Sequence, residues 1–263
     1  MIRIITGWSG PGGSTIAHIN LCNLFNENGL DCKLYGPHDW HMGRCRSGNY
    51  KEFMNSPSGS DDIIISHCCI LPENMQCRKH ILSCHETSLV DLRKIDLSRV
   101  DLIHFVSESQ KKWHPIDHPN LVIPNVISDL KKSPMGTHAA GVIGSIDSNK
   151  APHLSVKRAL EEAYLKVLLY GAVTDPEYLT DFLEPIIKEN PGRVIMKGHV
   201  DDQQSIYDSI DAAYHSSQRE AFNFIKAECE LTGVSYNGLD SCETGAEYTT
   251  KSEIWKRWKE LLA

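Results

Sequence analysis

The sequence has no long apolar run and no excess of basic residues. None of its 263 residues belongs to an uninterrupted apolar stretch of 18, so no segment has the composition of a membrane-spanning helix. Lys and Arg number 27 against 34 Asp and Glu, and the net charge of −7 opposes the phosphate neutralisation that drives non-specific nucleic-acid binding. The apolar run after Met1 ends at Gly7, too early for a signal peptide. We therefore expect a cytoplasmic protein without a transmembrane segment or a nucleic-acid partner.

The sequence also lacks paired cysteines. None of its nine cysteines belongs to a Cys-x-x-Cys pair, so we interpret them as reduced thiols of a cytoplasmic protein. Five potential zinc ligands do lie between His67 and His85, namely Cys68, Cys69, Cys77, His80 and Cys84. Their spacings match no common zinc pattern, and Cys68 and Cys84 end or flank apolar strands, where small buried thiols are normal. The prediction is structural thiols and no metal site.

Short β-branched runs alternate with helical periods along the chain, which is typical of an α/β protein with parallel sheets. The predicted strands are 2–6, 32–35, 63–66, 81–84, 102–106, 121–123, 142–143, 166–170, 194–196, 212–214 and 234–236. The polar segment 128–140 carries Pro and Gly and is predicted to be a linker. We therefore expect two Rossmann-like domains, 1–130 and 138–250. The first helix should follow the Gly7 to Gly13 loop, with Ser14 as its N-cap.

Two glutamates flank the start of a predicted helix near Phe222, directly after a predicted strand. A helix N-terminus has unpaired N–H groups and a positive dipole end, so the backbone amides of 221–224 are candidates to hold a phosphate. Glu220 is placed to accept hydrogen bonds from sugar hydroxyls, and Glu228, two turns on, from a second pair such as a ribose diol. The alternative interpretation is that Glu220 compensates the helix dipole and Glu228 is a solvated helix residue.

The Glu220-x7-Glu228 pattern resembles the Glu-x7-Glu motif of retaining glycosyltransferases with the GT-B fold, in a shortened form. Ala221-Phe222-Asn223 stands where that family usually has Gly-Phe-Gly, and Val142 to Lys150 resembles its Val-Gly-Arg-Leu-x-x-x-Lys segment. Other matching positions are Gly12-Gly13, His85 within Ser83-Cys84-His85-Glu86, the strand-ending Gly171, and Val194 to Gly198. The resemblance covers most of the chain and is most specific around Glu220 and Glu228.

The resemblance implies two Rossmann-like domains whose parallel sheets face a central cleft, an acceptor-side domain first and a nucleotide-sugar-binding domain second. It implies transfer of a hexose, with retention, from a UDP- or GDP-sugar to an unknown glycan, lipid or small-molecule hydroxyl. Charge on the leaving diphosphate would be stabilised by Lys150 and the helix N-terminus without a metal or another cofactor. The absence of an Asp-x-Asp pattern agrees with metal-independent transfer.

The resemblance also assigns residues to the site. Glu220, His85 and Lys150 would be catalytic, with His85 contacting the donor sugar or lying near the acceptor hydroxyl. The donor would be bound by Gly12, Gly13, Ser145, Lys150, Gly198, Ala221, Phe222, Asn223, Phe224 and Glu228. The two glycines after the first strand would let the backbone approach the diphosphate closely.

Two departures from the family pattern bear on activity. Ser145 stands at the family's phosphate-binding Arg, which leaves Lys150, with Arg193 or Arg219 nearby, to hold the phosphates. The first half is shorter than usual in the family. Alternatives are therefore a non-catalytic nucleotide-sugar-binding protein of the same fold and a sugar-nucleotide epimerase. A dehydrogenase is disfavoured, because the first glycine loop is not Gly-x-Gly-x-x-Gly and no acidic residue ends the second strand at Tyr35.

An amphipathic helix is predicted over 251–263. Its apolar face consists of Ile254, Trp255, Trp258, Leu261 and Leu262, opposite Lys256, Arg257 and Lys259. In the family that the chain resembles, a terminal helix packs back toward the first domain, and we expect the same here. The alternative is peripheral contact with a membrane surface.

Overall fold

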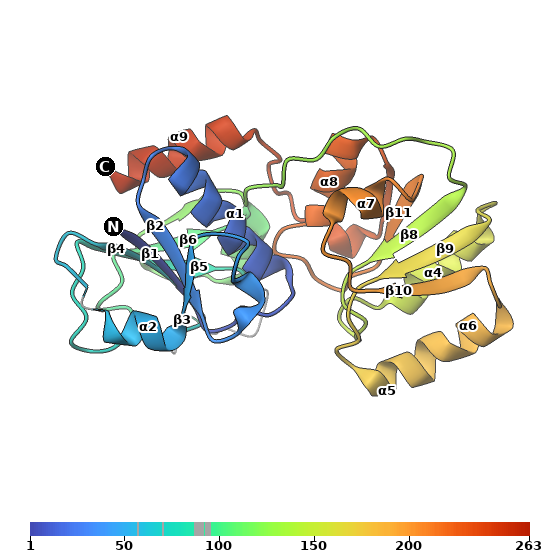
Figure 1. Ribbon diagram of the computed structural model, residues 1–263, viewed down its shortest axis with the longest axis horizontal. Coiled ribbons are helices and arrows are strands. Elements are labelled where there is room, and N and C mark those ends of the chain that lie inside the picture. Colours follow the sequence, from blue (N-terminus) through green and yellow to red (C-terminus); the bar gives the residue numbers. More distant parts are fainter. Residues whose placement is uncertain (57, 70, 87–91, 93–95) are drawn as a thin grey trace. The chain divides into compact units, whose positions relative to one another are not determined.

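The computed structural model describes residues 1–56, 58–69, 71–86, 92 and 96–263. The chain forms two compact units (Figure 1), residues 1–127 with 244–263 and residues 128–243, called unit 1 and unit 2 below. Unit 1 contains β1 (Ile2–Thr6), α1 (Gly13–Glu27), β2 (Cys32–Gly36), β3 (Ser47–Asn49), α2 (Tyr50–Asn55), β4 (Ile63–His67), β5 (Lys79–Cys84), β6 (Leu102–Phe105), α3 (Glu108–Trp113), β7 (Asn120–Val122) and α9 (Lys251–Leu262).

The sheet of unit 1 is parallel throughout and has the order β3-β2-β1-β4-β5-β6-β7. Because side chains alternate along a strand, Ile2 and Ile4 of β1 face one side of the sheet and Ile5 faces the other. The first side is covered by α1 and α9, and the second packs against Phe53 of α2. Helices on both faces are the reason that the central strands carry apolar side chains on both sides of the sheet.

Unit 2 contains β8 (Ala139–Ile143), α4 (Pro152–Glu161), β9 (Lys166–Tyr170), α5 (Pro176–Tyr178), a π-helical turn (Leu179–Leu183), α6 (Glu184–Glu189), β10 (Val194–Gly198), α7 (Gln203–Tyr207), β11 (Ala212–His215), α8 (Phe224–Thr232) and β12 (Ser235–Gly238). Its sheet is also parallel, in the order β10-β9-β8-β11-β12. Side chains of α4 and α6 cover one face, while α7 and α8 cover the other. The predicted α/β class and Rossmann-like sheets are confirmed.

Several predicted boundaries differ from the structure. Helix α1 begins at Gly13 with Gly12 at its N-cap, and the amide of Ile16 already bonds to the Gly12 carbonyl at 3.1 Å, so the prediction of Ser14 as the cap is wrong. β8 begins at Ala139, within the segment predicted as a linker. The helical stretch over 176–189 contains the π-helical turn because Pro185 has no N–H to bond to the carbonyl four residues earlier.

The predicted C-terminal helix forms and lies in the core of unit 1. Ile254 and Trp258 are 1% exposed, and Trp258 packs edge-on against Phe25 of α1, with ring centroids 5.5 Å apart. The main-chain carbonyls of Leu262 and Leu261 accept hydrogen bonds from the side chains of Arg78 and Lys79, at the start of β5. The apolar face of α9 is therefore covered by unit 1. Among the described residues, no helix is long and apolar enough to cross a membrane.

Candidate functional site

Three glycines end neighbouring strands at the carboxyl edge of the unit 2 sheet. Gly144 follows β8, Gly171 follows β9 and Gly198 ends β10, all with positive φ. A Cβ on Gly171 would lie 1.8 Å from the Gly144 carbonyl oxygen, so the two turns approach this closely only because Gly171 has no side chain. The amide of Gly171 also bonds to the Gly198 carbonyl at 2.8 Å. Ligands of open α/β sheets bind at the carboxyl ends of the strands, so these turns mark the candidate ligand-binding edge of unit 2.

Lys150 and Glu220 meet at this edge. The Lys150 Nζ lies 2.5 Å from Glu220 Oε1, and His215 Nε2, at the end of β11, lies 2.9 Å from the same oxygen. The two loops are tied together elsewhere, since the Gln218 amide bonds to the Asn149 carbonyl at 2.9 Å and Ser216 Oγ bonds to the Ala151 carbonyl at 2.7 Å. A cation, a carboxylate and an imidazole are therefore held in one cluster.

The charges of this cluster are set by its environment. Burial raises the pKa of the Glu220 carboxyl, but the Lys150 charge and the hydrogen bond from His215 outweigh burial, and the pKa falls to about 2. Burial lowers the pKa of His215, yet hydrogen bonds to Cys242 and Glu220 and the Glu220 charge raise it overall. Glu220 is thus an ionised acceptor at neutral pH, suited to receive hydrogen bonds from hydroxyl groups.

Glu228 is enclosed within unit 2 and only 4% exposed, which contradicts the alternative interpretation of a solvated helix residue. Its two carboxyl oxygens accept hydrogen bonds from Tyr207 Oη at 2.6 Å and Gln203 Nε2 at 3.1 Å. Burial raises the pKa of Glu228 to about 7, although both hydrogen bonds act in the opposite direction. The carboxyl group therefore changes protonation near neutral pH.

This pKa predicts that Glu228→Gln stabilises the fold at alkaline pH. A folded pKa of about 7, above the ordinary value of 4.5, means that the stability contributed by the neutral carboxyl is fully present below pH 4.5 and is lost as the pH rises to about 7. The substitution should raise the free energy of unfolding by about 3 kcal/mol at pH 8 and leave it nearly unchanged at pH 4. Urea unfolding at both pH values measures this. Glu230→Gln, exposed on the same helix, is the control, and an equal gain at both pH values would contradict the prediction.

The helix expected to start at Phe222 starts at Phe224, so Ala221, Phe222 and Asn223 precede it. The reason is Asn223, whose side chain caps α8 by accepting a hydrogen bond from the Lys226 amide at 3.0 Å. Asn223 Nδ2 also donates to Tyr236 Oη at 2.6 Å and to the Cys242 carbonyl at 3.1 Å. An asparagine in place of the family's second glycine is explained by these three bonds.

Two other residues of unit 2 that were predicted near the donor phosphates, Ser145 and Arg193, bond to groups of the protein itself. Ser145, which replaces the family's Arg, donates its hydroxyl to Asp147. Arg193 donates to the carbonyl oxygens of Leu160, near the end of α4, and of Tyr164, in the segment before β9, rather than assisting Lys150. Of the predicted cations, Lys150 is the one that contacts Glu220.

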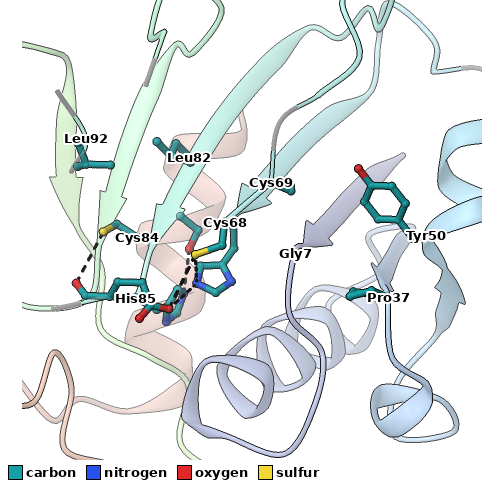
Figure 2. A pocket seen from close by; sticks show the side chains of 12 residues that line it. Gly7, Pro37, Tyr50, Cys68, Cys69, Leu82, Cys84, His85 and Leu92 are labelled. Carbon is teal, nitrogen blue, oxygen red and sulfur yellow. Dashed lines mark hydrogen bonds and ion pairs between the residues drawn. The ribbon is translucent and has the colours of Figure 1, made fainter. Parts of the chain in front are cut away.

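Unit 1 has its own cavity, of about 560 Å³, at the carboxyl edge of its sheet. Figure 2 shows Cys68, Cys84 and His85 on one side of it and Tyr50 and Pro37 on the other. The predicted residue His85 thus lines a cavity, and the exposed Gly12 and Gly13 begin α1 in the same unit.

His85 belongs to a group of four packed imidazoles. Its ring centroid lies 4.5 Å from that of His18, 5.2 Å from that of His67 and 6.2 Å from that of His104. Burial, together with the neighbouring histidines, lowers the pKa of His85 well below its ordinary value. At neutral pH, His85 is therefore uncharged and keeps one ring nitrogen as an acceptor.

A chain of hydrogen bonds determines which nitrogen that is. His104 Nε2 lies 2.8 Å from the Ile123 carbonyl oxygen and must donate to it, so His104 Nδ1 accepts from the Ser83 hydroxyl at 2.9 Å. Ser83 Oγ, 3.0 Å from His85 Nε2, then accepts from that nitrogen. The lone pair of His85 is therefore on Nδ1.

Sequence reasoning missed two parts of these sites. His215 was not predicted as a site residue, yet it contacts Glu220. The available signal was a histidine directly after the predicted strand 212–214 and just before the loop that contains Glu220. The histidine group was missed because its members come from α1, β4, β6 and the segment after β5. The available clue was that His67 ends one predicted strand and His85 follows another.

The sequence matches no known protein-family profile and no curated protein. The fold, by contrast, is that of GT-B glycosyltransferases. HepE from Anabaena, solved with UDP and glucose, aligns with 99% of this chain and 98% of its own at 12% identity, with a TM-score of 0.72. AviGT4, a glycosyltransferase involved in avilamycin A biosynthesis, aligns with 97% of this chain and 87% of its own at 16% identity, with a TM-score of 0.65. WaaG, a glycosyltransferase involved in lipopolysaccharide biosynthesis, aligns over 100% and 90% at 8% identity, with a TM-score of 0.64.

Proposed function

We propose that the protein is a retaining, metal-independent hexosyltransferase that uses a nucleotide-diphosphate sugar. The observation that carries the proposal is the contact of Lys150 and His215 with one oxygen of Glu220 at the carboxyl edge of a Rossmann-like sheet. In this arrangement the ionised carboxylate would accept hydrogen bonds from sugar hydroxyls, and Lys150 would stabilise the charge that develops on the departing diphosphate. His215 is a positioning residue, because it fixes the Glu220 carboxylate.

UDP-sugars are the proposed donors, since HepE has been solved with UDP and with UDP-glucose. Glu228 would contact the ribose once Tyr207 or Gln203 releases one of its oxygens. In unit 1, the neutral His85 would accept a hydrogen bond at Nδ1 from a sugar or acceptor hydroxyl. The nine unpaired cysteines support a reducing, cytoplasmic location.

Ser145 favours a second candidate, a nucleotide-sugar-binding protein without turnover. A serine bonded to Asp147 supplies none of the positive charge that an arginine would bring to the diphosphate. This candidate shares the donor site and differs in the rate of transfer. The two are therefore distinguished by nucleotide release and not by binding.

The test is a panel of UDP- and GDP-sugars with varied acceptors, using wild type and Glu220→Gln. We expect UDP release from one donor to fall about 100-fold in the variant, because the amide removes the charge that orients the sugar. Binding of UDP alone, measured by calorimetry, should change little, since UDP lacks the hexose that Glu220 would contact. Glu230→Gln is the matched control. Donor binding without release in wild type would favour the non-catalytic candidate, and absence of binding to every donor would contradict both.

A further inference from the structure

Three different ligand atoms converge on the wall of the unit 1 cavity. His67 Nε2 lies 3.3 Å from Cys68 Sγ and 3.3 Å from Glu86 Oε1, and the sulfur and the carboxylate oxygen are 3.8 Å apart. In a tetrahedral zinc site the nitrogen, sulfur and oxygen ligands are separated by about 3.3 to 3.7 Å, given bond lengths of about 2.0 to 2.3 Å. The separations of the three atoms are therefore close to those that one ion would require. Among the described residues, this is the group whose ligand atoms all lie within 4.8 Å of one another.

The protonation of His67 favours a metal at the same point. Thr6 Oγ1 lies 2.6 Å from the Trp8 carbonyl oxygen and donates its proton there, so it accepts from His67 Nδ1 at 2.9 Å. The hydrogen bond thereby fixes a proton on Nδ1 and leaves Nε2, which lies beside the sulfur and the carboxylate, as the nitrogen that can bind a metal. Metal-binding histidines usually donate their second nitrogen in this way.

The backbone positions these ligands through the fold. β4 and β5 are parallel neighbours, so the last residue of β4, His67, and the segment that follows β5 meet at one edge of the sheet. Cys68 turns the chain with a φ of +49°. A Cβ on Gly7 would lie 2.1 Å from the Cys68 carbonyl oxygen, so this approach depends on a glycine in the first loop.

We propose that His67, Cys68 and Glu86 bind a zinc ion whose fourth coordination position opens to the cavity. A borderline-soft ion accepts this mixture of imidazole, thiolate and carboxylate, whereas magnesium and calcium prefer oxygen ligands alone. Three protein ligands and one free position are the arrangement of zinc sites that bind an exogenous ligand. The donor chemistry proposed for unit 2 uses Lys150 instead of this ion.

The alternative to a metal ion is a second proton on His67 Nε2, which faces Glu86. With a second proton on Nε2, His67 would be a cation paired with Glu86 at 3.3 Å, and the cluster would need no metal. The two alternatives differ in whether the thiol is a ligand. A thiolate bound to Co²⁺ gives an intense near-ultraviolet charge-transfer band, which an imidazolium–carboxylate pair cannot produce.

The experiment is a titration of the metal-free full chain with Co²⁺, followed by displacement with Zn²⁺. We expect one equivalent to give the thiolate band together with the visible bands of a tetrahedral site, and Zn²⁺ to abolish both. Cys68→Ser should remove the thiolate band, and Thr6→Val should weaken binding about 10 to 100-fold through the unsupported imidazole. Cys69→Ser is the matched control, because that neighbouring thiol faces the Ile5 carbonyl instead.

Circular dichroism of each variant confirms folding before the titration. Wild type that gives no thiolate band, or a band that survives in Cys68→Ser and disappears in Cys69→Ser, would overturn the proposal. The titration does not involve a UDP-sugar, so absence of a zinc site would not contradict the proposed transferase. Absence of UDP-sugar binding would likewise not contradict the zinc site.

Discussion

Lys150→Ala is expected to lower kcat/KM for donor turnover about 100 to 1,000-fold, the loss typical of one preorganised charge or donor at a developing anion. The size of the effect follows from the composition of the cluster. Ser145 supplies no cation and Arg193 is bonded to backbone carbonyls, so these residues do not replace the missing ammonium group. Steady-state release of UDP measures the effect.

The same substitution leaves Glu220 facing His215 alone, so the fold must be checked separately. Lys150→Arg restores a cation at the site and should recover part of the activity. If Lys150 were only structural, the activity of each variant would instead follow its melting temperature. Lys157→Ala, exposed on α4, is the control for removing a lysine from this region. Turnover within a few-fold of wild type in a folded Lys150→Ala would refute the assigned role.

Trp258→Ala is expected to cost about 3 to 5 kcal/mol of unfolding free energy, the range for deleting a buried aromatic side chain. The indole is 1% exposed and contacts the rings of Phe25 and His104, at centroid distances of 5.5 and 4.9 Å. Its loss leaves a cavity that α1 and α9, each held at several points, fill only in part.

Urea unfolding monitored by circular dichroism measures this cost. Trp113→Ala is the matched control, because that side chain is 37% exposed and its removal should cost far less. Equal losses for the two variants would show that α9 contributes little to the core of unit 1.

Apolar periodicity predicted most strands correctly, since buried parallel strands such as Ile63–His67 are apolar on both faces. β3 (Ser47–Asn49) was not predicted, because an edge strand of Ser, Gly and Asn is defined by pairing with β2 and has no apolar pattern of its own. The start of α8 was misplaced by two residues for a related reason. The bonds of Asn223 to Tyr236 and Cys242 that fix it join segments separated in sequence.

The candidate site was predictable where one loop carries the residues, and less so where the fold assembles them. Glu220 and Lys150 were found by motif, but their mutual contact and the third partner, His215, depend on the order β8-β11 in the sheet. The sequence predicted no metal site, because the spacings of the cysteines and histidines between His67 and His85 match no common zinc pattern. The ligands proposed from the structure are one Cys, the residue before it and a glutamate 18 positions later.

The return of α9 to unit 1 has a consequence for how the chain acquires its structure. Residues 128–243 are continuous, whereas the core of unit 1 combines Ile4 and Phe25 with Trp258 and Leu262. A ribosome therefore finishes all of unit 2 before it supplies the last helix of unit 1. During that interval the apolar face formed by α1 and the central strands stays exposed, because α9 has not yet been synthesised. Unit 1 is therefore begun first and completed last.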